Sequence, residues 1–174
     1  IRMGLNNNIG QPTAIIACIK HIQIIDSTEL LKTSSYWTPQ DETQIKNWFT
    51  LYMDWLIDSS QGQFEASSDN NHHTWFNAQL IPKEKYLGFY NLTINYLLDT
   101  INVITNQITD QGKQPHELIR TNSWHYSNYN LLALTTIAAQ SQHINDLNLI
   151  NSAPYCYLPD MLRLIYRQEP TQVF

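Results

Sequence analysis

The sequence predicts an all-α fold in which antiparallel helices are joined by short turns. Apolar residues recur at helical spacing in several stretches, and no stretch shows the strict alternation of a half-buried strand. Glycine, which is common in the turns of β-rich folds, contributes only 5 of the 174 residues. A chain of this length can bury a substantial core, and we expect one domain over residues 1–174.

Composition argues against several functional classes. The net charge is −5 and no basic run occurs, so we expect no nucleic-acid partner. No run of about 18 apolar residues is present, so we expect no membrane span. Cys18 and Cys156 lack CxxC spacing, which predicts two small buried hydrophobic residues rather than a zinc motif or a disulfide framework. The chain opens with Ile1, as a fragment or a processed product does, so a missing signal peptide gives no information on compartment.

The first third of the chain predicts two helices. Pro12 suits a first helical turn, and isoleucines follow it at helical spacing. Ser27 or Thr28 is then predicted to cap a short turn over residues 29–34. Residues 38–42 (TPQDE) form a strong helix start, with a cap, a proline and two acids in the first turn. The apolar stripe after this start is predicted to be core, with a cleft lined by Trp48 or Trp55 as the alternative: Ile45, Trp48, Phe49, Tyr52, Trp55 and Leu56.

The middle of the chain predicts a loop and one long helix. Residues 58–69 are polar and rich in serine, which indicates a loop. Pro82 is predicted to begin the longest helix, over residues 83–108, and residues 110–115 to break it.

The last third predicts a buried helix over residues 126–142, because this stretch is apolar on nearly all sides. We expect irregular structure over residues 143–157 and a final helix over residues 158–168.

The stretch over residues 69–79 concentrates amide, imidazole and indole groups around one formal charge. Asn70 or Asn71 is predicted to cap a helix that starts near His72. The backbone N–H groups at such a start favour an anion, and Asn71 and His72 could then face one ligand group.

A second polar cluster, Glu117, Arg120, His125, Tyr126 and Tyr129, complements the first. Arginine supplies a permanent charge with bidentate geometry, and tyrosine can act as general acid or base beside a cation. Together the clusters offer what proton transfer on an acidic sugar needs. Arg120 and Tyr126 can share a cleft only if Arg120 precedes the helix that carries Tyr126, and residues 121–123 signal such a break.

Structural explanations remain open for these residues. His72 could satisfy a buried backbone group, Tyr126 could be a core aromatic, and Arg120 could pair with Glu117 three residues earlier. A metal pair of His72 and His73 is disfavoured, because helical neighbours point about 100° apart and no HExxH motif or cysteine cluster is present. We therefore predict no metal and no other cofactor.

Both clusters resemble motifs of the alginate-lyase-type polysaccharide lyases, which have an (α/α) toroid fold. Residues 70–77 (NNHHTWFN) are similar to the family pattern NNHGTWYD. Residues 117–131 (ELIRTNSWHYSNYNL) are similar to its E-x-x-RT-x-S-x-x-YS-x-FNL pattern. The resemblance implies β-elimination on a uronate-containing acidic polysaccharide, alginate or a related uronan, without a metal. It also implies a secreted or periplasmic protein, and at this length an incomplete barrel of antiparallel helical hairpins.

The resemblance assigns roles to single residues. Asn71 and His72 take the carboxylate-binding positions, Arg120 supplies charge, and Tyr126 protonates the departing O4 oxygen. Further substrate contacts are expected from neighbours in both motifs: Asn70, His73, Trp75, Gln79, His125 and Tyr129. The sequence departs from the family pattern at His73, Phe76 and Asn77, which replace a glycine, a tyrosine and an aspartate. The alternatives are a carbohydrate-binding homologue that is inactive or truncated, and a helical interaction scaffold.

Overall fold

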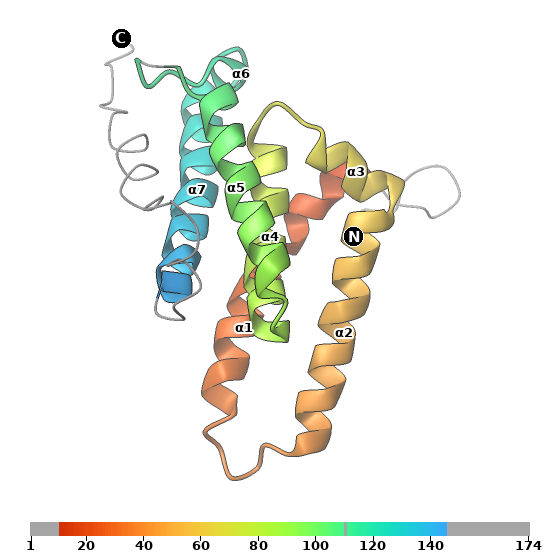
Figure 1. The fold of residues 1–174 in the computed structure, drawn as a ribbon. Helices are drawn as coiled ribbons and strands as arrows, with labels where there is room; N and C mark the ends of the chain where they lie inside the picture. The colour runs from red at the N-terminus through yellow and green to blue at the C-terminus, as the bar shows by residue number, and fades with distance from the viewer. Residues whose placement is uncertain (1–10, 110, 146–174) are drawn as a thin grey trace.

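The structure, a computed structural model, describes residues 11–109 and 111–145, with side chains as far as residue 141. Every regular element in these residues is a helix (Figure 1). In chain order they are the 3₁₀ helix η1 (Pro12–Ile19), then α1 (Lys20–Leu31), α2 (Pro39–Asp58), α3 (Ser60–Ala66), α4 (Asn71–Leu87), α5 (Tyr90–Gln107), α6 (Pro115–Leu118) and α7 (Ser123–Asn145).

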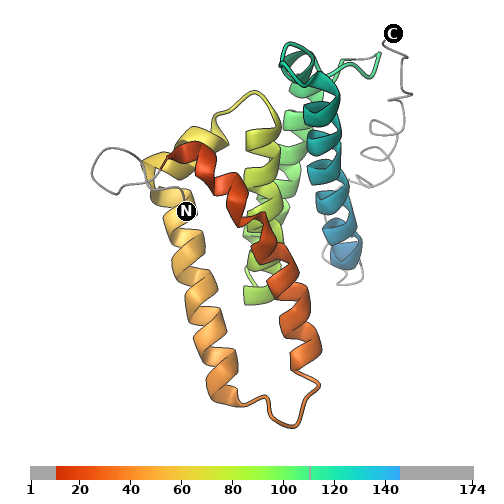
Figure 2. The ribbon, with the colours of Figure 1, turned by 180° about the vertical axis from the view of Figure 1, so that it is seen from behind.

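Helix α4 lies at the centre of the arrangement. It contacts η1, α1, α2, α3, α5 and α7. Helices α1 and α2 form one antiparallel hairpin, α4 and α5 form a second, and α7 runs back beside them (Figures 1 and 2). The predicted all-α architecture of antiparallel hairpins is therefore confirmed. No helix in the described part of the chain is long and apolar enough to cross a membrane.

Two hydrophobic clusters pack on opposite sides of α4. One joins α4 to α5 and α7 through Ala78, Ile81, Ile104, Leu134 and Ile137. The other joins α4 to η1 and α2 through Ile15, Met53, Leu56, Phe76 and Leu80. A helix with core on both sides has little polar face, which is why residues 74–84 are all buried.

The start of α2 follows the sequence prediction. Thr38 is the N-cap, its hydroxyl accepts from the Asp41 N–H at 3.2 Å, and the Asp41 carboxylate accepts from the Thr38 N–H at 2.9 Å. The prediction that the whole following stripe is core is wrong in part. Phe49 is fully buried, whereas Trp48 and Trp55 are 43% and 44% exposed. Both indoles pack against Tyr52, and Trp48 also contacts His21 of α1.

Two predicted boundaries before α4 are wrong. The polar stretch over residues 58–69 contains the helix α3, and the Ser59 hydroxyl caps it by accepting from the Gly62 N–H at 3.0 Å. Ser27 and Thr28 do not cap a turn, because both lie inside α1 and their hydroxyls donate to the carbonyls four residues earlier. Serine and threonine serve equally as caps and as such internal donors, so their presence alone does not fix a boundary.

Pro82 does not begin a helix. It lies inside α4, so the predicted helix over residues 83–108 is in fact the end of α4 followed by the antiparallel α5. Burial of α4 on both sides outweighs the hydrogen bond that proline cannot make. The break comes instead at Gly88, whose φ of 85° closes the helix while Phe89 N–H donates to the Glu84 carbonyl at 2.8 Å.

Helix α7 starts at Ser123 and extends to Asn145, so it is longer than predicted and contradicts irregular structure at residues 143–145. Its burial on nearly all sides is also wrong, since Leu132 is 54% exposed while Leu134 and Ile137 are fully buried. The remaining predictions for residues 146–168, and that for Cys156, lie outside the described residues. Cys18 is a half-buried free thiol.

Two glycines provide a matched test of backbone freedom against close packing. A Cβ at Gly88 meets nothing within 4 Å, so Gly88→Ala is expected to cost only the left-handed strain, about 1 kcal/mol in the free energy of unfolding. A Cβ at Gly62 would lie 1.7 Å from the Leu56 carbonyl oxygen at the end of α2. Gly62→Ala should therefore cost more, about 3 kcal/mol. Denaturant unfolding measures both values, and equal losses would contradict this account.

Glu84 predicts a pH dependence of stability. Its side chain is fully buried, neither carboxylate oxygen has a hydrogen-bond partner among the described residues, and burial raises its pKa from 4.5 to about 8. The folded state therefore keeps a proton that the unfolded state releases between these values. The contribution of Glu84 to the free energy of unfolding is therefore fully present below pH 4.5 and is lost as the pH rises to about 8. Glu84→Gln should flatten this decline in urea unfolding measured across that range, and an unchanged slope would contradict the raised pKa.

Candidate active site

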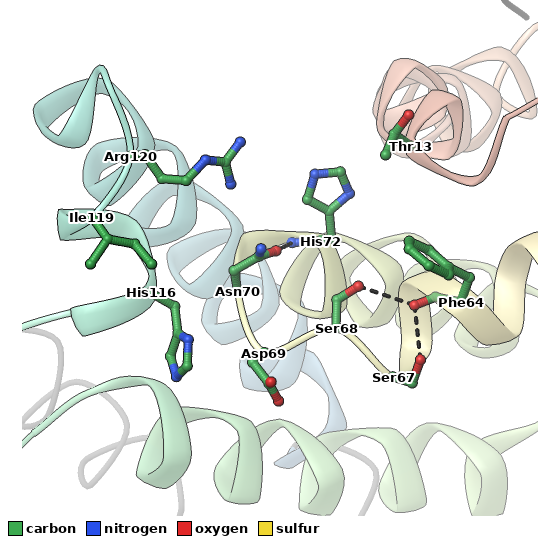
Figure 3. A pocket seen from close by; sticks show the side chains of 10 residues that line it. All are labelled: Thr13, Phe64, Ser67, Ser68, Asp69, Asn70, His72, His116, Ile119 and Arg120. Atoms are coloured by element: carbon green, nitrogen blue, oxygen red, sulfur yellow. Dashed lines mark hydrogen bonds between the residues drawn. The ribbon is translucent and has the colours of Figure 1, made fainter.

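Four segments meet at one end of the bundle: α3, the start of α4, α6, and the start of α7 (Figure 1). A cavity of about 420 Å³ opens there, and we call it the His72 cavity. Figure 3 shows the imidazole of His72 between Arg120 on one side and Thr13 and Phe64 on the other. The residues that line it include Thr13, Asn70, His72, His116 and Arg120.

The start of α4 presents His72 to this cavity. Asn70 is the N-cap, as predicted, and its side-chain oxygen accepts from the His72 N–H at 3.0 Å. Because the cap fixes the first turn of the helix, it also fixes the direction in which the second helical residue points. The side chains of Asn70 and His72 consequently line the same wall.

A buried carboxylate holds the imidazole from behind. Nδ1 of His72 lies 2.5 Å from Oε2 of Glu65, and Glu65 on α3 is fully buried. An ionised carboxylate can only accept, so it places a proton on Nδ1 and leaves Nε2 free to meet a ligand. The His72 side chain therefore bonds a carboxylate rather than a backbone group, and it lines the cavity.

A second buried carboxylate holds Asn71. Oε1 of Glu117 accepts from the backbone N–H of Asn71 at 2.6 Å and from its side-chain amide at 2.8 Å, and both residues are 1% exposed. The anion that the start of α4 favours is thus the protein's own Glu117. Asn71 does not face the His72 cavity, and Glu117 engages Asn71 rather than pairing with Arg120.

Arg120 and Tyr126 lie together across the break between α6 and α7. The guanidinium carbon of Arg120 is 4.0 Å from the centre of the Tyr126 ring, and Arg120 itself lines the His72 cavity. A cation over an aromatic face is an attractive contact, and here it places a permanent charge beside a phenol. Tyr126 is half-buried rather than part of the core.

The remaining predicted contact residues are distributed among three places. Trp75 is 3% exposed and Gln79 is fully buried, so neither offers surface to a ligand. Nε2 of His73 lies 2.9 Å from Oδ2 of Asp99, and this hydrogen bond lowers the pKa of the Asp99 carboxyl. The His73 side chain lines a smaller cavity of about 160 Å³. His125 and Tyr129 stack on each other along α7, with ring centres 5.9 Å apart.

Comparisons with known proteins give the family of this chain. The family model described as alginate lyase matches residues 2–154. The chain belongs to the alginate lyase family. The crystal structure of an alginate lyase from Bacteroides ovatus matches with a TM-score of 0.76 and 27% sequence identity, over 81% of this chain and 37% of that one. The chain thus spans little more than a third of the length of that alginate lyase, and the search of curated proteins found no match.

Within this alginate lyase fold, the sequence did not single out Glu65. It lies seven residues before His72, on a helix that the sequence predicted as loop, so no spacing rule connected the two. Glu117 was part of the second motif, but its partner Asn71 lies 46 positions away. In the part of the chain that the structure describes, no group of three or more His, Cys, Asp or Glu residues could hold a metal ion.

Proposed function

We propose that this chain carries the proton-transfer site of a polysaccharide lyase that cleaves a uronate-containing polymer, alginate or a related uronan, by β-elimination. The observation that carries the proposal is that His72 and Arg120 line one cavity while Arg120 lies over the ring of Tyr126. Membership of the alginate lyase family supports the same reaction class. A polymeric substrate also suits a secreted or periplasmic protein.

The reaction removes the proton at C5, forms a C4–C5 double bond and expels the O4 oxygen. Arg120 is proposed to pair with the uronate carboxylate, where negative charge grows as the C5 proton leaves. Nε2 of His72 accepts that proton, and Glu65 stabilises the imidazolium that forms. Tyr126 donates its phenolic proton to O4, and the neighbouring guanidinium stabilises the phenolate that remains. For the opposite epimer at C5, Tyr126 is proposed to act as both base and acid.

Asn71 has a conditional role in this proposal. The family resemblance places it on the carboxylate beside His72, but its amide nitrogen donates to Glu117. The residue is 1% exposed, so it can reach a ligand only when the start of α4 opens. With the bond closed, Asn71 contributes by fixing the first turn of α4, and thereby the position of His72.

Incubation with alginate and with glucuronan tests the proposal, because β-elimination creates an unsaturated uronate that absorbs in the ultraviolet. A rise in absorbance that His72→Ala abolishes would support it. The absence of any rise, for this chain and for a longer protein that contains it, would refute it. Binding of the polymer without turnover would favour the inactive carbohydrate-binding homologue.

Glu65 gives the proposal a sharper test. Glu65→Gln keeps the size of the side chain and an oxygen for Nδ1, but it removes the charge that stabilises the imidazolium. We expect kcat to fall about 10- to 100-fold, the equivalent of one charge-assisted hydrogen bond. Glu29→Gln, at an exposed glutamate on α1, is the matched control. Steady-state kinetics with circular dichroism of the fold would decide, and a fall no larger than that of the control would remove Glu65 from the mechanism.

A further inference from the structure

A second cavity, of about 470 Å³, lies between η1 and α7, and we call it the η1–α7 groove. One wall is formed by successive turns of η1 and the start of α1, and the other by Tyr129 of α7. Figure 2 shows η1 crossing α4 on this side of the molecule, with α7 beyond it. The proposed mechanism makes no use of this groove.

The groove continues from the His72 cavity. Thr13 lines both cavities, so they adjoin along η1. The opposite walls are also connected through neighbouring residues. Arg120 contacts the ring of Tyr126, and Tyr129 lies one helical turn further along α7. A chain-like ligand that leaves the His72 cavity along η1 therefore enters the groove directly.

The dimensions and surface of the groove suit a sugar chain. The wall extends along the helix axis for seven residues from Thr13 to Lys20, which is about 14 Å at the 3₁₀ rise of about 2 Å per residue. That distance exceeds the width of a single sugar ring. Ala14 and Ala17 have short side chains that leave room along this wall, and Tyr129, which packs against Trp75 and His125, lines the opposite wall.

The charges of the groove select an anion. Lys20 lies at its far end, is exposed, and forms no ion pair with any described residue. In contrast, Lys32 and Lys46 pair with glutamates. No acidic side chain is among the described residues that line the groove. In a protein of net charge −5, Arg120 and Lys20 thus mark the two ends of one path with positive charge.

We propose that the η1–α7 groove is a second binding site for the same acidic polysaccharide, in which Lys20 pairs with the carboxylate of a uronate beyond the bond that is cut. The inference rests on the proposed function, since that function defines the occupant of the His72 cavity. It predicts that affinity rises with oligomer length until the ligand reaches Lys20. The rise should weaken with salt, as expected for an exposed ion pair.

The test is the binding of uronate oligomers of increasing length, measured by calorimetry in the Tyr126→Phe background so that no turnover occurs. Lys20→Gln should weaken the binding of long oligomers about fivefold, so that the gain in affinity with length largely disappears. Ala17→Leu, which fills the groove, should affect long oligomers in the same way. Lys113→Gln, at an exposed lysine outside both cavities, is the matched control and should keep the gain.

The outcomes separate the two proposals. If the wild-type protein cleaves the polymer but Lys20→Gln and Ala17→Leu bind every length as the control does, the groove is not a binding site and the lyase proposal stands. If neither cleavage nor binding of any uronate is found, both proposals fall. A length-dependent loss without any cleavage would support the groove and overturn the catalytic role.

Discussion

Replacement of Tyr126 by phenylalanine is expected to lower kcat on a uronate polymer about 10²- to 10⁴-fold, the usual contribution of a general acid or base. The variant loses only the hydroxyl. The ring that lies under the Arg120 guanidinium is kept, so the contact at 4.0 Å and the fold should survive. Initial rates from ultraviolet absorbance give kcat, and calorimetry with the same polymer gives the affinity, which should change little.

Tyr90→Phe is the matched control for this experiment. It removes a hydroxyl from another half-buried tyrosine, at the start of α5 and outside the His72 cavity. Turnover should be unaffected in this variant. If Tyr126→Phe lost activity, affinity and thermal stability in equal measure, Tyr126 would be a packing residue and the acid would have to be sought elsewhere.

Replacement of Glu117 by alanine is expected to lower the free energy of unfolding by about 3 kcal/mol, because it leaves two buried donors without an acceptor. The donors are the backbone N–H and the side-chain amide of Asn71, which share one carboxylate oxygen. Activity should fall as well, since the first turn of α4 positions His72. Denaturant unfolding measures the loss of stability, and steady-state kinetics measures the loss of activity.

Glu117→Gln separates hydrogen bonding from charge. Its amide oxygen can still accept from the Asn71 N–H, so the loss of stability should be clearly smaller than for alanine. An equal loss in both variants would mean that the charge at the start of α4, rather than the bonds, stabilises the fold. A loss below about 0.5 kcal/mol in the alanine variant would contradict the described geometry.

Local sequence signals predicted those features of the fold that depend on neighbouring residues. The caps at Thr38 and Asn70 were predictable because a cap and its partner lie within three positions. Gly88 carries the signal for the end of α4, whereas tertiary packing overrides the signal for a helix start at Pro82. Proline in a helix interior is tolerated here because the surrounding core stabilises α4 on both sides.

The candidate site was predictable in its members but less so in its arrangement. Two sequence motifs identified His72, Arg120 and Tyr126 as candidates. In the structure His72 and Arg120 line one cavity, and Tyr126 contacts Arg120. Burial of Asn71 could not be foreseen, because it depends on a carboxylate 46 positions away. The pairing of Glu65 with His72 required α3, a helix that the sequence did not predict.

The central position of α4 has a consequence for engineering this protein. The helix begins with the groups that hold His72 and then passes between both hydrophobic clusters. Because one helix joins these groups to the core, repacking near Leu80 or Ile81 is expected to change the position of His72. Substitutions that stabilise this core are therefore expected to alter the geometry of the candidate site as well.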